Sequence, residues 1–264
     1  MGTTSEGVFI LTPPSYPRGI ILGDTSKPSQ TEFEQSLTQQ YRLGRQLVYD
    51  DGRKFRYAYN GGIALAKAYM TQSPAGVTNC QAETQTTSGA NVNIGDQEII
   101  VDVTNASAIT DDLYAEGWLH VDSSTGIGDG YKIISCQLLT TITARLLLET
   151  PIRTDWSATS VITLTKNRWN GVLVSVTTAT QTPTGVPLIA VSVNYYCWLQ
   201  TAGPCPIYVD NGDTIVIGNN VGTPGTAAAA GTCGTQTAGT LPIWGQVMYV
   251  AAGDAVALID LHLD

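Results

Sequence analysis

Apolar and polar residues alternate along most of this chain, in short runs that are typical of half-buried β-strands. The runs follow one another at intervals of roughly 10 to 15 residues, and no amphipathic helical pattern separates them. The predicted strands of the body lie at 99–103, 117–122, 130–136, 141–149, 161–165, 171–178, 191–200, 245–250 and 255–263. This arrangement predicts an all-β protein whose body is a β-barrel or a β-sandwich.

The sharpest local pattern lies at residues 47–60. Two alternating runs flank Asp51-Gly52, a pair that favours a tight turn between antiparallel strands. The segment is therefore predicted to form a hairpin, and the apolar run at 63–70 a short helix or turn behind it. Because little else near the N-terminus resembles a packed element, we interpret residues 47–75 as a docking element.

Residues 1–46 are rich in Pro, Ser, Thr and Gln, and their prolines forbid long regular elements. Short extended segments are predicted at 8–11 and 19–22, and a short helix at 32–41. Such a segment buries too little apolar surface to order by itself. It is predicted to be an extended N-terminal arm that lies on the body, on a sister subunit or on another protein.

Residues 76–264 are predicted to be the β-rich body. A hairpin is expected at 207–217 around Asn211-Gly212. The Gly, Thr and Ala residues of 218–240 predict a flexible surface loop.

The charge of the chain excludes some partners. Charged residues are 13% of the chain, about half the usual share of roughly 25% in soluble domains. The net charge is −9, made up of +2 in residues 1–70 and −11 in residues 71–264. An acidic body repels nucleic acid, so no direct nucleic-acid partner is expected. A near-neutral to basic arm suits contact with an acidic protein neighbour.

The chain also lacks the marks of export and of membrane insertion. No apolar run reaches the ~18 residues of a membrane-spanning helix, so no membrane partner is expected. The five cysteines form no CxxC motif or disulfide pattern, which favours synthesis in a reducing compartment. Whether Cys197 and Cys205 pair across a turn stays open.

Few residues suit catalysis or metal binding. His120 and His262 both lie in strand patterns, and no zinc-ligand spacing or phosphate-binding glycine loop occurs. The acidic loops 122–129 and 210–213 offer hard oxygen ligands for calcium, but turn formation explains the same residues. We therefore predict no catalytic residue, no cofactor and no metal site.

Two further groups of side chains leave alternatives open. Asp111, Asp112 and Glu116 form a carboxylate cluster, which either supports a glycosidase or simply lies in a solvated turn. Tryptophans stack on sugar faces or pack in a core, and their spacing does not separate the two roles. The tryptophans are Trp118, Trp156, Trp169, Trp198 and Trp244.

The two ends of the chain and its C-terminal third resemble tailed-bacteriophage virion proteins of the capsid decoration, or cement, type. The segments that carry the resemblance are Leu43-Gly44, 51–57, Gly61-Gly62, 195–204 and 245–261. Residues 71–190 resemble that family only in being β-rich.

The resemblance implies a non-enzymatic protein on the outer capsid surface of a virion, made in the host cytoplasm. It implies a β-barrel-like body, an N-terminal arm on the major capsid protein, and a homo-oligomer, with a trimer preferred. Within the arm and hairpin, we expect capsid contact from Phe9, Ile20, Arg42, Arg45, Arg53, Phe55, Arg56 and Tyr57. The alternatives are a glycan- or receptor-binding virion module, such as a head fibre or tail tip, another self-assembling tail or filament subunit, and a polysaccharide hydrolase.

Overall fold

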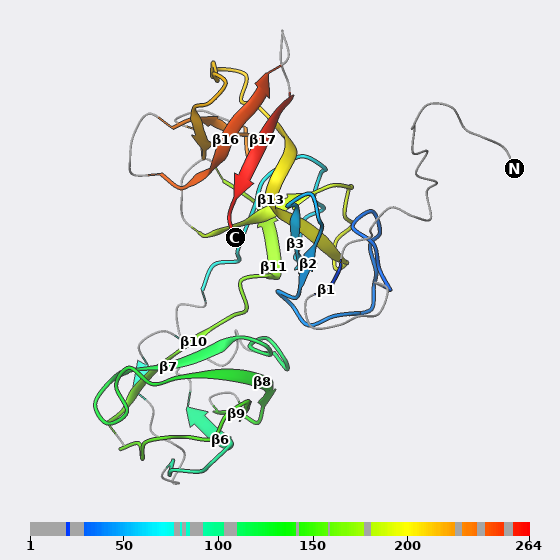
Figure 1. Cartoon of the computed structure of the whole chain (residues 1–264). Helices are drawn as coiled ribbons and strands as arrows, with labels where there is room; N and C mark the ends of the chain where they lie inside the picture. Colours follow the sequence, from blue (N-terminus) through cyan, green and yellow to red (C-terminus); the bar gives the residue numbers. More distant parts are fainter. Residues whose placement is uncertain are drawn as a thin grey trace, which may run out of the picture.

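The computed structural model describes most of the chain after residue 28. The described residues are 20–21, 29–76, 80, 83–84, 92–102, 110–140, 143–157, 159–176, 181–224, 229–236, 241–250 and 256–264. They form seventeen strands and no α-helix, so the all-β prediction is confirmed. The strands make two sheets in two lobes, a larger one and a smaller one (Figure 1).

The larger sheet has eleven strands, in the order β1-β2-β3-β11-β4-β12-β13-β17-β16-β14-β15. Its strands are β1 (Ile20–Ile21), β2 (Gln46–Val48), β3 (Lys54–Asn60), β4 (Thr71–Gln72), β11 (Asn170–Val174), β12 (Pro183–Pro187), β13 (Tyr196–Tyr208), β14 (Asn220–Gly222), β15 (Gly234–Thr235), β16 (Ile243–Val250) and β17 (Val256–His262).

Five of these strands close into a barrel. An additional pairing joins β3 to β13, which completes the ring β3-β11-β4-β12-β13. The β3–β13 ladder is antiparallel and runs from Tyr59 opposite Tyr196 to Lys54 opposite Ala202. The predicted hairpin is also confirmed, because Leu47 of β2 lies opposite Phe55 of β3. β3 is thus part of the barrel, rather than part of a separate docking element.

Strand β13 links the barrel to the rest of the larger sheet (Figure 1). Its first half pairs with β3, and its second half pairs with β17 from Ala202 to Tyr208. Gly203 lies between the halves at φ +78°, where a Cβ atom would approach the Arg53 Cα to 3.1 Å. Pro204 and Pro206 follow, and they are tolerated because this half of β13 pairs, among the described strands, with β17 alone.

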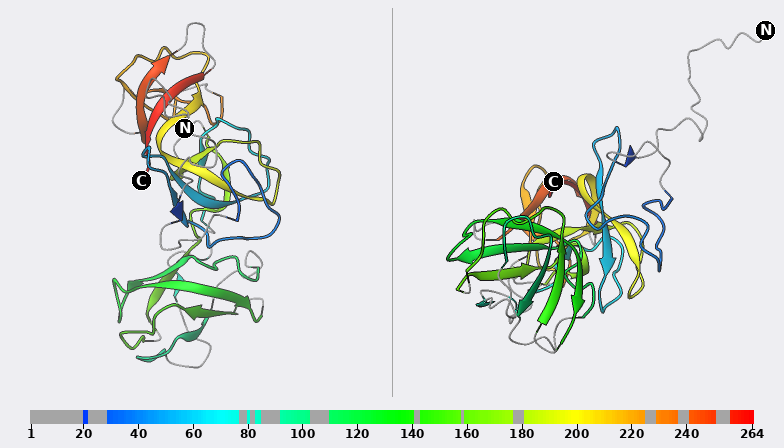
Figure 2. Two further views of the ribbon diagram at one scale, coloured as in Figure 1. Left: turned by 45° about the vertical axis from the view of Figure 1, so that its right-hand side comes forward. Right: turned by 90° about the horizontal axis from the view of Figure 1, so that it is seen from below.

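The smaller lobe is an insertion between two barrel strands. Its six strands lie in the order β5-β10-β7-β8-β9-β6. Their bounds are β5 (Glu83–Thr84), β6 (Glu98–Asp102), β7 (Trp118–Ser123), β8 (Gly130–Leu138), β9 (Thr143–Leu148) and β10 (Val161–Thr165). The chain leaves the barrel after β4 and returns at β11, which pairs antiparallel with β4. Exit and return are adjacent, as an inserted domain requires. Figure 2 shows both lobes from two further directions.

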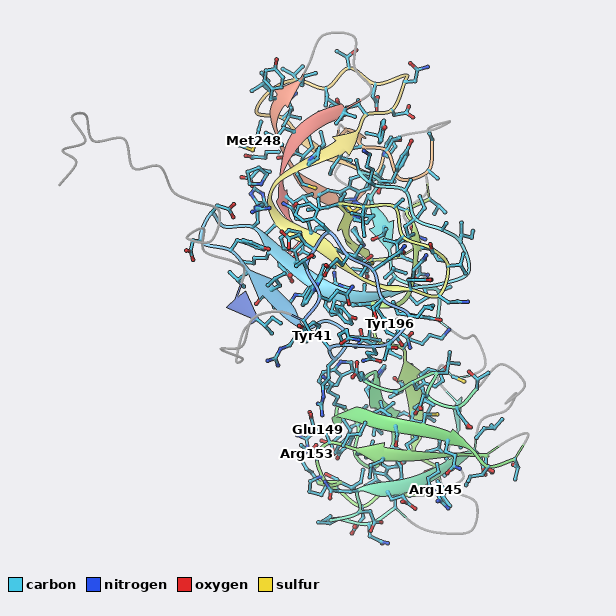
Figure 3. The ribbon with its side chains drawn as sticks, turned by 90° about the vertical axis from the view of Figure 1, so that its right-hand side faces the viewer. Tyr41, Arg145, Glu149, Arg153, Tyr196 and Met248 are labelled. Carbon is cyan, nitrogen blue, oxygen red and sulfur yellow. The ribbon has the colours of Figure 1, made fainter. Side chains whose placement is uncertain are left out.

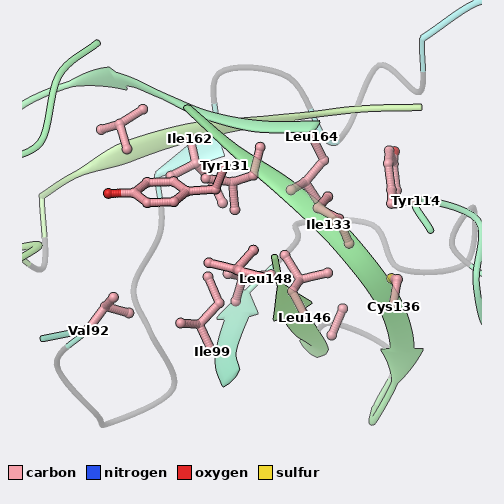
Figure 4. Packing of buried hydrophobic residues seen from close by; sticks show 14 of the residues in the cluster. Val92, Ile99, Tyr114, Tyr131, Ile133, Cys136, Leu146, Leu148, Ile162 and Leu164 are labelled. Carbon is pink, nitrogen blue, oxygen red and sulfur yellow. The ribbon is translucent and has the colours of Figure 1, made fainter. Parts of the chain in front are cut away.

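Each lobe has its own hydrophobic core. The strands of the smaller lobe alternate buried and exposed side chains, as β7 does with Leu119 and Val121 inward. Aromatic and aliphatic side chains from β6 to β10 meet on the inner face of this sheet (Figure 4). In the barrel, Ala58 and Cys197 belong to an inner cluster, while the outer face of the same strands carries Tyr57 and Trp198.

The predicted helix at 32–41 is wrong, and of the two forms predicted for 63–70 the structure contains the turn, at Lys67 and Ala68, and no helix. In residues 63–70, Leu65 forms a bridge with Val191, and the Met70 N–H donates to the Gly231 carbonyl oxygen. In residues 32–41, Ser36 forms an antiparallel bridge with Tyr196. A short isolated helix is only marginally stable, so backbone hydrogen bonds to the barrel prevail in both segments.

Two predictions near the C-terminus are also corrected. The Asp210–Asp213 turn forms, but residues 214–217 do not pair back on 207–209, so no hairpin is present. Val209 instead forms a parallel bridge with Cys233. The predicted loop at 218–240 contains β14 and β15, which pair with each other, and its Val221 is buried. Its residues 225–228 and 237–240 lie outside the described part.

Candidate functional site

The described part of the predicted arm, residues 29–46, lies on the outer face of the barrel. Gln30 is buried there and makes three side-chain hydrogen bonds to its surroundings. Its Oε1 accepts from the Tyr57 hydroxyl at 2.7 Å, and its Nε2 donates to the Tyr196 and Glu34 carbonyl oxygens at 3.1 and 2.9 Å. The Trp198 indole N–H donates to the Gln30 carbonyl oxygen at 3.0 Å. Residues 29–46 are thus an integral layer of the larger lobe.

This layer corrects two of the expected capsid contacts. Phe55 and Tyr57 are both 0% exposed, because their face of β3 is covered by the arm. Tyr57 also packs edge-on against the Tyr41 ring at a centroid distance of 5.3 Å. Neither side chain can reach a partner without unfolding the layer, so both are core residues. Phe9 lies outside the described residues, and Ile20 is the first residue of β1.

Three of the four expected arginine contacts have acidic partners within the chain. Arg42 Nη1 lies 3.4 Å from Glu149 Oε1, with both side chains largely exposed. Arg53 Nε lies 2.7 Å from Asp51 Oδ2 and packs its guanidinium over the Tyr49 ring. Arg45 is half-buried, and its carbonyl oxygen accepts from the Tyr57 N–H.

Arg56 forms the most buried of these ion pairs. Its Nε and Nη2 donate to the two carboxylate oxygens of Asp264 at 2.6 and 3.1 Å. The Thr201 hydroxyl donates to the same carboxylate at 2.8 Å. Burial raises the pKa of Asp264, but the hydrogen bonds from Arg56 and Thr201 and the nearby positive charges outweigh burial. The pKa of Asp264 therefore lies below its usual value.

A cavity of about 610 Å³ lies where the two lobes meet. It is lined by residues from both lobes and from the arm layer: Gln39, Leu43, Tyr59, Thr110, Asp111, Asp112, Leu113, Ala115, Glu116, Ile134, Ser135, Asn170 and Tyr196. Figure 3 shows Tyr196 at the side of the larger lobe that faces the smaller one. The lining combines carboxylates, amides and hydroxyl groups with two tyrosine rings, and such a surface can hold a small polar ligand.

The carboxylate cluster predicted from the sequence lies on the smaller-lobe wall of this cavity. Each carboxylate already accepts a backbone N–H: Asp111 from Leu138 at 2.8 Å, Asp112 from Cys136 at 3.4 Å, and Glu116 from Leu43 at 2.5 Å. Glu116 thereby ties the arm layer to the smaller lobe. The three side chains have a clear structural role, and they also give the cavity a negative wall.

The other candidate sites serve the fold. Asp129 accepts from the Tyr131 hydroxyl at 2.9 Å, and Asp210 accepts from the Ala229 N–H at 2.8 Å, so both acidic loops contain hydrogen-bonded carboxylates. His120 lies 3.0 Å from Asp122, and His262 lies 3.3 Å from Asp260; both histidines are on exposed strand positions, and both aspartates are half-buried. Among the residues that the structure describes, no group of three or more His, Cys, Asp or Glu side chains could hold a metal ion.

The tryptophans divide between core and surface. Trp156, Trp198 and Trp244 are buried in three different clusters, and Trp169 is half-buried, so they line no common sugar platform. Trp118 differs, because 53% of its surface is exposed on the outer face of β7.

Trp118 belongs to an exposed apolar row on the smaller sheet. The outer faces of four adjacent strands, β7, β8, β9 and β6, each contribute one apolar side chain. The members of this apolar row are Trp118, Ile134, Leu147 and Ile100. The four residues are diagonal neighbours rather than direct cross-strand partners, since Trp118 lies opposite Lys132 and Ile100 opposite Arg145. Exposed apolar residues grouped in this way on a sheet are suited to contact with another protein.

No disulfide joins the five cysteines, and all five thiols are buried. Cys197 and Cys205 lie eight residues apart on the same strand β13, which separates them by roughly 26 Å at the rise of an extended strand. They do not pair across a turn.

Sequence reasoning missed every lining residue of the cavity except the three carboxylates, including Gln39, Tyr59, Asn170 and Tyr196. They come from segments far apart in the chain, and their local sequence pattern does not predict that they line the same cavity. Tyr196 lies in a segment that carries the family resemblance, but the resemblance gave it no role.

Among the described residues, the structure contains no helix of the length and apolarity needed to cross a membrane. No protein-family model matches the chain, and neither a curated protein nor a solved structure shows significant similarity to it.

Proposed function

We propose that this chain is a non-enzymatic virion structural protein of a tailed bacteriophage. In this role it binds the outer surface of the major capsid protein lattice and stabilises the head, as a decoration or cement protein. It acts there as a homo-oligomer, with a trimer preferred, after synthesis in the host cytoplasm. The proposal starts from the resemblance of the chain ends to that family.

The observation that carries the proposal is an N-terminal segment attached to an anchored edge strand. Strand β1 ends the larger sheet, pairs with β2, and buries Ile21 at 1% exposure. The nineteen residues that precede β1 include the four-residue apolar run 8–11, which contains Phe9. When this segment binds a capsid, the pairing of β1 with β2 holds the folded larger lobe next to the capsid surface.

The apolar row on the smaller sheet supports a second contact from the body. Large exposed aromatic residues are over-represented among the residues that dominate protein–protein affinity, and Trp118 is the largest side chain in the row. By contrast, Arg42, Arg53 and Arg56 are paired with carboxylates of the same chain, so they contribute less to capsid contact than the unpaired arginines expected from the sequence would.

Two separate contacts per chain suit a cement protein. A capsid lattice under internal pressure is held by many copies, and each copy bridges neighbouring capsid subunits. Linked contacts raise the effective affinity far above that of either one alone. Modest interfaces at the arm and at the apolar row are therefore sufficient.

The test is co-sedimentation with heads of the source phage prepared without this protein. The full chain is expected to bind, a chain lacking residues 1–19 to lose most binding, and Trp118→Ser to bind more weakly. Ile127→Ser is the matched control, because Ile127 is 68% exposed but lies in the β7–β8 turn, outside the row. It is expected to bind like the full chain.

The deletion should stop before β1. Removing residues 1–46 would also remove Gln30 and Leu43, whose burial covers the barrel face around Tyr57. Failure of the full chain to bind heads, or density for it at a tail tip in electron micrographs of the particle, overturns the proposal. The mass of the assembled protein in solution tests the trimer.

A further inference from the structure

We propose that the cavity between the lobes is a binding site for a neutral oligosaccharide. The tests of the two proposals are independent, because Trp118 does not line the cavity, and Ile134, the one member of the apolar row that does, is varied in neither test. The two proposals can therefore fail separately.

The position and size of the cavity suit a small ligand. Its volume of about 610 Å³ falls within the usual range for small-ligand sites, and it lies between lobes, where such sites concentrate. The chain closes it from three sides: the β3, β11 and β13 ends of the barrel, the loop at 110–116 of the smaller lobe, and Gln39 of the arm layer.

Two tyrosine rings form an aromatic wall of the cavity. The rings of Tyr59 and Tyr196 lie at a centroid distance of 4.8 Å with an interplanar angle of 45°, and both are only half-buried. The Tyr59 hydroxyl donates to Asn194 Oδ1 at 3.1 Å, which fixes the ring at the cavity edge. Aromatic rings with a polar end pack against the C–H faces of sugars while leaving their hydroxyl groups hydrated.

The polar lining of the cavity offers both hydrogen-bond donors and acceptors. The Oδ1 atoms of Asp111 and Asp112 accept backbone N–H groups, and the second oxygen of each carboxylate is an acceptor with remaining capacity. Asn170 lies at the start of β11 and offers both an amide donor and an acceptor. Ser135 adds a hydroxyl group from β8. Sugar hydroxyl groups donate and accept, so they match this mixed set.

The negative charge of the lining restricts the class of ligand that the cavity can bind. It contains Asp111, Asp112 and Glu116 but no Lys or Arg. An anionic sugar would lack a compensating cation in the site and would be repelled. A basic peptide would satisfy the charge, and its backbone amides bond to the same polar groups, so it is the competing ligand that the test separates; the paired rings of Tyr59 and Tyr196 favour the sugar. The lining therefore favours a neutral oligosaccharide.

The test is saturation-transfer NMR on the full chain with maltotetraose, cellotetraose and tetra-N-acetylchitotetraose. We expect at least one to bind with a Kd below about 10 mM, and to bind about tenfold more weakly to the Asp111→Asn/Asp112→Asn variant. Asn tolerates the left-handed backbone that Asp112 adopts at φ 59°, so the variant is expected to fold. Asp50→Asn is the surface control for the loss of a carboxylate away from the cavity, because Asp50 is exposed in the β2–β3 turn.

Three results would overturn the inference. One is no saturation transfer from any of the three oligosaccharides at about 10 mM, a concentration that detects even weak binding. Another is binding that the double variant and the control weaken equally. The third is binding of tetralysine in place of the sugars, lost at high salt, which would make the cavity a site for a basic peptide.

Discussion

Replacing Gln30 by alanine is expected to loosen the arm layer from the barrel. Gln30 is 3% exposed, and its side chain bonds to the Tyr57 hydroxyl and to the carbonyl oxygens of Tyr196 and Glu34. Burial raises the pKa of Tyr57, so its hydroxyl is neutral and donates at ordinary pH. The substitution removes the acceptor for that buried donor.

The size of the effect follows from these three hydrogen bonds. Each contributes a net ~1 kcal/mol, and leaving the Tyr57 donor unsatisfied adds to the cost. The freed conformational entropy of the glutamine offsets part of this loss. We expect the free energy of unfolding of the larger lobe to fall by about 3 kcal/mol. Gln40→Ala is the control, because Gln40 is exposed, and its effect should stay within about 0.5 kcal/mol.

The measurement is urea unfolding followed by tryptophan fluorescence, with Trp198 as the reporter beside Gln30. Because each lobe has its own core, the two lobes can unfold in separate transitions, and only that of the larger lobe should move. A double-mutant cycle with Tyr57→Phe should show a coupling of about 1 kcal/mol between the two side chains. If Gln30→Ala is no more destabilising than Gln40→Ala, residues 29–46 are not an integral layer.

Two further substitutions and one thiol-labelling reaction test the fold. Asp264→Asn should cost about 2 kcal/mol at pH 7 by breaking the bidentate pair with Arg56. In the folded protein the pKa of Asp264 lies below its ordinary value of 3.8. The difference in stability between the wild-type chain and Asp264→Asn should therefore be complete above pH 3.8 and shrink as the pH falls through the folded pKa. Thermal melts at several pH values would show this. Gly245→Ala places a Cβ atom 2.0 Å from a carbonyl oxygen of β17 and should destabilise by more than about 3 kcal/mol in urea, whereas Gly130→Ala meets nothing within 4 Å and should be near neutral. Burial raises the pKa of Cys205 to about 12, so a thiol reagent at pH 8 should modify it only after unfolding, and rapid labelling of the native protein would contradict its position.

Much of the secondary structure was readable from local pattern. The alternation at 161–165 predicted β10 with its observed bounds, and the Asp51-Gly52 turn predicted the β2–β3 hairpin. These elements depend on side chains that alternate between two faces and on turn residues with few conformations, both of which are local properties. The short strands β4, β5, β14 and β15 were not predicted, because two or three residues carry too little periodicity, and β12 was missed because its Pro and Gly residues are typical of turns.

The roles of residues in the hairpin depended on the tertiary structure. The sequence shows that Phe55 and Tyr57 share one face of β3. It does not show that residues 29–46 cover this face, because the hydrogen bond from Trp198 to Gln30 joins residues that are 168 positions apart in the sequence. Residues expected to contact a capsid are therefore core residues.

The sequence by itself determined the all-β class, most of the longer strands and the acidic character of the body, since each depends on composition or on neighbouring residues. Only the tertiary structure decided that β3 closes a barrel with β13, that the smaller lobe is an insertion, and that Tyr59, Asn170 and Asp112 line one cavity. The physical reason is that strand pairing satisfies backbone groups between segments that are distant in sequence. The local pattern specifies which residues point to the same side of a strand, but it does not identify the segment that will cover them.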